Sequence, residues 1–234
     1  MLFRSDVSAV SFHAYTTIAD RYALLPCGAS FGDGYGPCLV AKKKHSREDL
    51  KKLRLAVPGL LTSAYLTLQL YLGLPHGKFQ AVVVPFDKIQ DEILTGRVDA
   101  GLLIHEGQLT YAEEGFTLCE DLGKWWADET GGLPLPLGGN VVRRTLGTEL
   151  ISAVSQTLRE SVRYALEHRQ AGVRHALPLS RGMDEQRTDK FIGMYVNDLT
   201  LDFGSRGRDS LREFYHRAQK AKLIQKVPEI PGLP

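Results

Sequence analysis

The middle of the chain alternates short apolar runs with longer segments in which apolar residues recur at helical spacing. The runs at 54–57, 80–84 and 100–104 show no polar alternation, and they predict buried strands. The segments 62–72 and 86–94 lie between these runs and predict helices. Strands of this kind, separated by helices, are typical of a parallel sheet that is covered on both faces. The pattern therefore predicts a βαβαβ unit within an α/β protein.

Segments on either side of this unit predict further α/β structure. The N-terminal part predicts a strand at 6–10, a helix at 14–22 and a second strand directly after it. A helix that begins near Thr148 places its apolar residues at close to helical spacing, so we expect it to face the core. The segments 189–199 and 209–221 repeat this pattern and predict two more core-facing helices.

Two glycine-rich connectors, 28–37 and 131–139, bracket the central unit. Glycine permits the backbone conformations that turns require, so both connectors are predicted loops. Two crossings that flank one α/β unit predict two lobes, the second inserted into the first. We expect residues 1–37 and 138–234 to form the first lobe and residues 38–137 to form the second. A cleft between the lobes is the expected binding site.

Composition and charge narrow the class of protein. The chain has 234 residues, of which 43% are hydrophobic and 24% charged, as is ordinary for a soluble globular protein. Lys and Arg number 29 against 27 Asp and Glu, a formal net charge of +2. This balance predicts no nucleic acid and no membrane as a partner, and the apolar runs are far shorter than the ~20 residues of a spanning helix. The sequence leaves the oligomeric state open.

The three cysteines, Cys27, Cys38 and Cys119, cannot all pair within the chain, and none belongs to a C-x-x-C unit. Their odd number favours a reducing compartment, and their spacing does not predict a zinc or redox site. Arg4 near the start of the chain leads into no apolar stretch, so a secretory signal is not expected. The expected location is the cytoplasm.

Candidate functional residues follow the predicted strands, because the ligand of an open parallel sheet lies beyond the carboxyl ends of its strands. Thr62 and Ser63 come soon after strand 54–57 and open the next helix. A helix N-terminus offers unpaired N–H groups and the positive end of the helix dipole, so two hydroxyls there suit a carboxylate or phosphate. Plain helix capping is the alternative, and it explains one hydroxyl more readily than two.

His105 directly follows strand 100–104, with Glu106 beside it. A histidine is a reasonable general base because its ordinary pKa lies near neutral pH, and a structural histidine bonded to a neighbouring loop is the alternative. The pair begins like the zinc motif H-E-x-x-H, but Leu109 occupies the second His position, so the zinc protease interpretation fails. Ser11 follows strand 6–10, where it either bonds to a ligand or forms a turn.

A G-x-S-x-G pattern at 28–32 is centred on Ser30. In a nucleophile elbow the chain passes from the serine directly into a helix, whereas here a glycine-rich stretch follows. The same glycines lack the G-x-G-x-x-G spacing and do not open a helix. We therefore expect neither a serine nucleophile nor a dinucleotide site.

Several motifs, in order along the chain, match one known family. They are DVSAVSFHAY at 6–15, AVPG at 56–59, TSAY at 62–65, GLLIHE at 101–106, DLGKWW at 121–126, LPLPLG at 133–138 and YVN at 195–197. With these motifs the chain resembles the 1,4-dihydroxy-6-naphthoate synthases of the futalosine route to menaquinone. The resemblance implies a two-lobed α/β fold of the type II periplasmic-binding-protein kind, with mostly parallel sheets and a ligand cleft between the lobes. It also implies a carbon–carbon lyase that converts cyclic dehypoxanthine futalosine to 1,4-dihydroxy-6-naphthoate.

The resemblance also implies roles for the candidate residues. His105 would be the general base, Thr62 and Ser63 would hold a carboxylate of the small-molecule substrate, and Ser11 would line the cleft from the other lobe. No metal or redox cofactor is implied. Chorismate dehydratase of the same pathway and a non-catalytic binding protein of the same fold are the alternatives. The SFHAY and IHE runs favour the naphthoate synthase over the first, and the lack of a signal peptide argues against the second.

The chain departs from the family pattern at its N-terminus. Members of the family begin with an extra segment, carrying a Ser-Pro-Cys-Pro-Asn-Asp-Thr-Phe-like loop, ahead of the part that matches Asp6. Residues 1–5 match nothing in that segment. The segment would supply the first strand and helix of the first lobe and some ligand contacts, so we expect a chain without it to be weakly stable or inactive.

Overall fold

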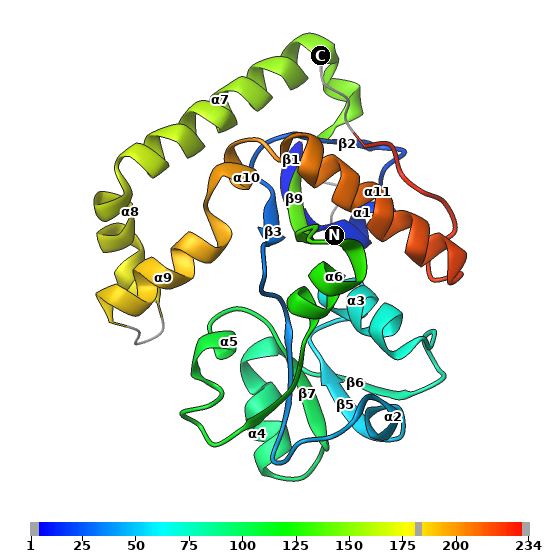
Figure 1. Cartoon of the computed structure of the whole chain (residues 1–234). Coiled ribbons are helices and arrows are strands. Elements are labelled where there is room, and N and C mark those ends of the chain that lie inside the picture. Colours follow the sequence, from blue (N-terminus) through cyan, green and yellow to red (C-terminus); the bar gives the residue numbers. More distant parts are fainter. Residues whose placement is uncertain (1–4, 181–183, 231–234) are drawn as a thin grey trace.

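The computed structural model describes residues 5–180 and 184–230, and its strands form two sheets that lie one above the other in Figure 1. Most of the segment at which the family resemblance departs, residues 1–4, lies outside the described residues. Within the described ranges, no helix combines the length and apolar character that a bilayer crossing needs.

The first sheet is built around β9 (Leu135–Arg143). Strands β1 (Val7–Ser11), β2 (Tyr22–Leu24) and β3 (Ser30–Gly32) each pair antiparallel with it. β1 and β2 therefore run in the same direction, as a crossover connection requires, but β9 lies between them and runs the opposite way. This sheet departs from the mostly parallel arrangement that was expected, because the chain inserts β9 there when it returns from the second sheet.

The second sheet has the order β6-β5-β7-β4-β8. Its strands are β4 (Cys38–Ala41), β5 (Arg54–Val57), β6 (Gln80–Val83), β7 (Ala100–Leu103) and β8 (Thr117–Asp121). β5 pairs parallel with β6 and β7, whereas β4 pairs antiparallel with β7 and β8. The predicted βαβαβ unit is thus confirmed, with α3 (Ser63–Leu72) and α4 (Ile89–Leu94) as its helices.

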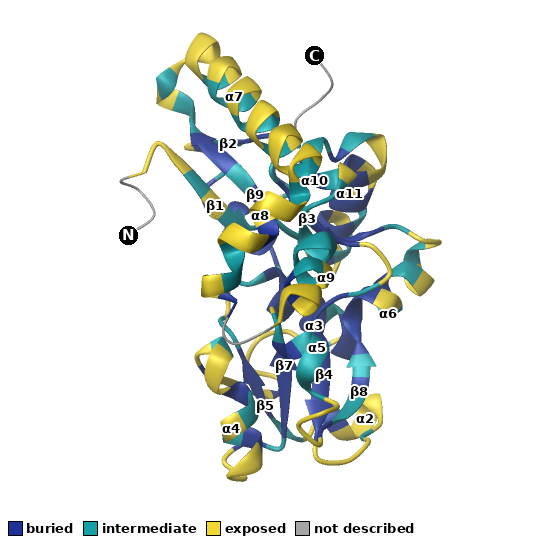
Figure 2. Cartoon of the chain, turned by 90° about the vertical axis from the view of Figure 1, so that its left-hand side faces the viewer, coloured by how far each residue is buried: buried dark blue, intermediate teal, exposed yellow. Residues whose placement is uncertain are grey.

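Strand β6 differs from the other strands of the parallel unit. β5 and β7 are buried, and β7 is dark blue in Figure 2, but Val82 and Val83 of β6 are 39% and 56% exposed. The prediction that residues 80–84 are buried on both faces is wrong, because β6 is an edge strand of the sheet.

The remaining helical segments cover the two sheets and join them. They are α1 (Phe12–Tyr15), α2 (Arg47–Leu50), η2 (Phe86–Lys88), α5 (Gly107–Thr110), α6 (Leu122–Thr130), η3 (Arg144–Leu146), α7 (Thr148–Glu167), α8 (Arg169–Ala176), η4 (Leu177–Leu179), α9 (Glu185–Tyr195), α10 (Asp198–Leu201) and α11 (Gly204–Lys220).

Two N-terminal predictions differ from the structure. The helix expected at 14–22 is the four-residue α1, since Phe12 and Tyr15 are fully buried and the chain then turns. The connector 28–37, expected to be a loop, contains β3, because its residues pair with β9. Both differences arise from contacts with distant parts of the chain, which short-range patterns do not contain.

Helix α7 has the expected amphipathic pattern but none of its residues is buried. Its apolar face is only partly covered, by η3, α8 and α10. Figure 1 shows the helix running along the outside of the first sheet. The expectation of a core-facing helix is therefore wrong in degree: the apolar face turns inward, but few elements pack against it.

The two sheets share packed side chains through α3 and α6. Trp126 of α6 is fully buried in the core of the first sheet, while Leu122 of the same helix belongs to the core of the second. Leu66 of α3 likewise packs in the first core, although most of α3 packs in the second. These helices hold the two sheets against one another and so shape the space between them.

Candidate active site

A cavity of about 590 Å³ lies between the two sheets. Ser11 lines it from the side of the first sheet, and Thr62, Ser63 and His105 line it from the side of the second. The structure therefore brings together all four candidate residues, which come from three separate parts of the chain. Much of the remaining lining is apolar, from residues such as Val10, Ile104, Leu137, Phe191 and Ile192.

The N-terminus of α3 forms one wall of the cavity. Thr62 is the N-cap: its hydroxyl oxygen accepts from the N–H of Tyr65 at 3.1 Å and its O–H donates to the carbonyl of Gly59 at 2.8 Å. The buried Ser63 accepts from the N–H of His13 at 3.3 Å, and its O–H meets no acceptor among the described residues, so the hydroxyl hydrogen is left for a ligand. Within the described ranges, the N–H groups of Ser63 and Ala64 have no protein acceptor. This wall thus offers two amides and one hydroxyl to an anion.

Ser11 and His13 join the two sheets at one end of the cavity. The Ser11 hydroxyl accepts from the N–H of Ala14 at 3.0 Å and donates to the carbonyl of Leu61. The Nδ1 atom of His13 lies 3.3 Å from the carbonyl oxygen of Thr62. His13 is buried, and this desolvation lowers its pKa, an effect opposed by the bond to Thr62. His13 belongs to the DVSAVSFHAY motif at 6–15, but only the folded chain brings it to the second sheet.

His105 stands at the end of β7 in a left-handed backbone conformation, with φ of 59°. This conformation costs a non-glycine residue roughly 1–2 kcal/mol, although histidine adopts it more often than most residues. The ring is exposed and packs on Phe86, with 4.7 Å between the ring centroids. Backbone strain of this kind concentrates at functional sites, so the geometry agrees with a chemical role for His105.

Two lining residues that the sequence analysis did not propose are Gln108 of α5 and Tyr195 of α9. They hydrogen-bond to one another at 2.8 Å, across 87 residues of sequence. Burial raises the pKa of Tyr195 to about 12. The YVN motif at 195–197 was a signal for Tyr195, whereas nothing local distinguishes Gln108 from a solvated helix residue.

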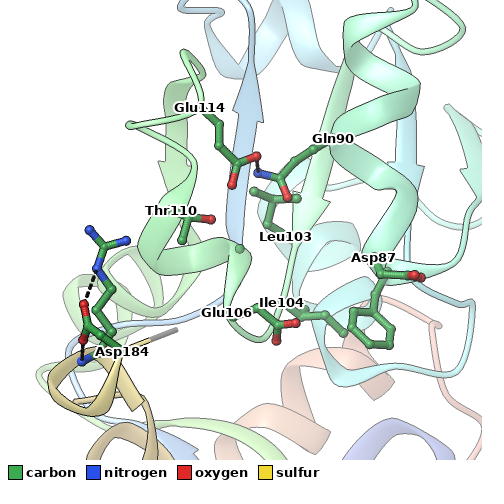
Figure 3. Close-up of a pocket in the computed structure, with 11 residues that line it drawn as sticks. Asp87, Gln90, Leu103, Ile104, Glu106, Thr110, Glu114 and Asp184 are labelled. Atoms are coloured by element: carbon green, nitrogen blue, oxygen red, sulfur yellow. Dashed lines mark hydrogen bonds and ion pairs between the residues drawn. The ribbon is translucent and has the colours of Figure 1, made fainter. Parts of the chain in front are cut away.

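A second cavity, of about 510 Å³, lies beside Glu106 (Figure 3). Glu106 and Asp87 lie at one end of it, and Gln90 and Glu114, which are hydrogen-bonded at 2.6 Å, lie at the other. A smaller cavity of about 330 Å³, lined by both His105 and Glu106, shares lining residues with each of the other two. Among the residues that the structure describes, no group of three His, Cys, Asp or Glu side chains is arranged to hold a metal ion.

Ser30 also lines the main cavity, at the start of β3. The chain continues from β3 through a turn into β4 and not into a helix. The strand-to-helix turn that exposes the serine of a nucleophile elbow is therefore not formed at Ser30.

Comparison with known proteins gives consistent matches over nearly the whole chain. A family described as "Menaquinone biosynthesis" matches residues 3–220. Two curated proteins named 1,4-dihydroxy-6-naphthoate synthase, from Streptomyces coelicolor and Thermus thermophilus, are each 36% identical to it. The matches cover 94% and 96% of this chain and 77% and 80% of those proteins.

Solved structures give matches of two kinds. The crystal structure of protein AF1704 from Archaeoglobus fulgidus is 42% identical, with a TM-score of 0.88, over 94% of this chain and 81% of that one. The alkanesulfonate-binding protein SsuA from Xanthomonas axonopodis pv. citri is 13% identical, with a TM-score of 0.62, over 95% and 78% of the two chains. The second match is one of fold, and it confirms the two-lobed binding-protein-like architecture.

Proposed function

The chain belongs to the menaquinone biosynthesis family, and on that premise we propose that it is a 1,4-dihydroxy-6-naphthoate synthase, a lyase of menaquinone biosynthesis. Its substrate in this proposal is cyclic dehypoxanthine futalosine, from which it releases the sugar-derived fragment by breaking a carbon–carbon bond. The reaction product is a flat, two-ring carboxylate. The cavity is largely apolar and has anion-binding groups at the N-terminus of α3, so it suits a molecule of that shape and charge.

The observation that carries the proposal is that one cavity is lined both by groups that can bind a carboxylate, at Ser63 and Ala64, and by a candidate base, His105. The amides of Ser63 and Ala64, with the Ser63 hydroxyl, bind the substrate carboxylate at the N-terminus of α3. Thr62 contributes by capping the helix, since its hydroxyl is already bonded to Tyr65 and Gly59. Ser11 lines the opposite wall and ties it to the second sheet.

His105 acts as the general base of the proposed reaction. Its ring extends from a corner that the backbone holds in an unusual conformation, so the imidazole has a defined position beside the bound substrate. A base placed within hydrogen-bond reach of the proton it removes contributes roughly 10²- to 10⁴-fold to the rate.

The proposal includes a division into lobes and a location. Residues 1–37 and 138–234 as one lobe and 38–137 as the other would place the cavity between them, which is supported by the distribution of strands between the two sheets. A cytoplasmic location is supported by Cys27, Cys38 and Cys119, each of which is a buried free thiol.

The test is to incubate the purified chain with cyclic dehypoxanthine futalosine and to follow 1,4-dihydroxy-6-naphthoate by chromatography and mass spectrometry. The proposal predicts product from the parent chain, in contrast to the inactivity expected from its N-terminus, and at least about 100-fold less product from His105→Asn. The same assay is run with chorismate. Dehydration of chorismate would contradict the proposed function. Tight binding of cyclic dehypoxanthine futalosine without turnover, by both the parent chain and His105→Asn, would also contradict it.

A further inference from the structure

We propose that Gln108 and Tyr195 are positioning residues for the reaction proposed above, in which they hold His105 in its left-handed backbone conformation. The inference rests on the proposed function for the role of His105. It concerns two residues from opposite walls of the cavity, Gln108 of α5 and Tyr195 of α9.

The Gln108 carboxamide has three hydrogen-bond partners. The oxygen and nitrogen of an amide are assigned by their partners. With Oε1 toward Tyr195, it accepts from the Tyr195 hydroxyl at 2.8 Å and from the backbone N–H of His105 at 3.0 Å. The Nε2 atom then donates to the carbonyl of Gly36 at 2.7 Å. One side chain therefore satisfies the backbone of the residue that carries the candidate base.

The other partners of Gln108 are themselves held in place by close contacts. Gly36 lies in the connector between β3 and β4, and a Cβ atom on it would come within 2.4 Å of the Gly123 nitrogen. The Tyr195 ring packs edge-on against Tyr35, with 6.1 Å between centroids. Because Oε1 of Gln108 faces it, the Tyr195 hydroxyl is the donor of the bond between them.

The left-handed conformation of residue 105 is less favourable than the ordinary regions, so it persists only where neighbouring contacts hold it. The bond from the His105 N–H to Gln108 is such a contact, and it depends on bonds to Gly36 and Tyr195. When the carboxamide is absent, the backbone at 105 relaxes and the imidazole leaves the position from which it reaches the substrate. A displacement of about 1 Å at a reacting group can cost about 10²-fold in rate.

The test compares Gln108→Leu, Tyr195→Phe and the double variant with the parent chain. Gln156→Leu and Tyr164→Phe make the same chemical changes at exposed positions of α7 and serve as controls. We expect Gln108→Leu to lower kcat by about 10- to 100-fold with KM within about threefold of the parent. Tyr195→Phe should lower kcat by about 2- to 10-fold, and the double variant should be no worse than Gln108→Leu alone, because both act through one network.

Amide hydrogen exchange at His105 provides a readout that does not require turnover. We expect the His105 N–H to exchange about tenfold faster or more in Gln108→Leu and to keep its parental rate in both control variants. Unchanged kcat and unchanged exchange in Gln108→Leu would overturn the inference, as would a rise in KM with kcat intact, which would mark Gln108 as a substrate-binding group. If the parent chain makes no product, the proposed function fails; exchange at His105 then decides whether Gln108 holds its backbone.

Discussion

Replacing His105 by Asn and by Ala separates the chemistry of its ring from the backbone conformation of the residue. Both substitutions remove the imidazole and its packing on Phe86. They differ in the backbone, because Asn enters the left-handed region readily whereas Ala pays the full steric cost at a φ of 59°. The two variants should therefore be equally inactive but unequally stable.

The size of the stability difference follows from this cost. A left-handed residue is disfavoured by roughly 1–2 kcal/mol when its Cβ is unaccommodated. At about 2.1 cal/mol/K per residue, the unfolding entropy of 234 residues is roughly 0.5 kcal/mol/K. His105→Ala should then melt about 2–4 °C below His105→Asn.

Thermal melts followed by circular dichroism, together with product formation from cyclic dehypoxanthine futalosine, test both halves of this prediction. Turnover should fall by at least about 10²-fold in each variant. An Ala variant that melts at or above the Asn variant would show that the conformation at 105 carries no strain. A variant that keeps more than a tenth of the parental turnover would refute the role of His105 as the base.

Three further perturbations test the walls of the cavity. Thr62→Val removes the cap of α3, so we expect a loss of about 0.5–2 kcal/mol in unfolding free energy and a raised KM; an unchanged melting temperature would contradict the capping role. Gly123→Ala places a Cβ 1.9 Å from the Tyr35 carbonyl oxygen and should lower the unfolding free energy by about 1–3 kcal/mol or more. Gly172→Ala, in open space on α8, should not lower it. Equal melting temperatures of the two variants would refute the close approach at Gly123. Burial lowers the pKa of His13, so the unfolded chain binds that proton more readily than the folded chain. The unfolding free energy should therefore fall as the pH drops from about 7 through the ordinary histidine pKa of 6.5, and it should fall less steeply in His13→Gln. Identical slopes of melting temperature against pH in the two proteins would contradict the lowered pKa of His13.

The parts of this molecule that could be predicted from the sequence are those that neighbouring residues specify. Continuous apolar runs and helical spacing predicted β5, α3, β6, α4 and β7 in the right order. Candidates chosen because they follow strands, namely Ser11, Thr62, Ser63 and His105, do line one cavity. Their roles in catalysis and binding stay predictions. For Thr62, Ser63 and His105 the reason is geometric, since β5 and β7 are parallel neighbours whose carboxyl ends lie at one edge of the second sheet. Ser11 reaches the same cavity from the first sheet, which is not parallel.

Contacts between distant segments account for what the sequence did not reveal. The insertion of β9 between β1 and β2, and the pairing of β3 with it, depend on backbone groups that all strands share, so no side-chain pattern announces them.

The same holds for the link from Gln108 to Tyr195 and for the burial of His13 against Thr62. Composition and periodicity indicate whether a segment forms a helix, a strand or a loop. They also indicate the strand ends at which functional residues can lie. Which hydroxyl caps a helix, which remains for a ligand, and which backbone bond holds the histidine are settled only when segments from both walls of the cavity meet.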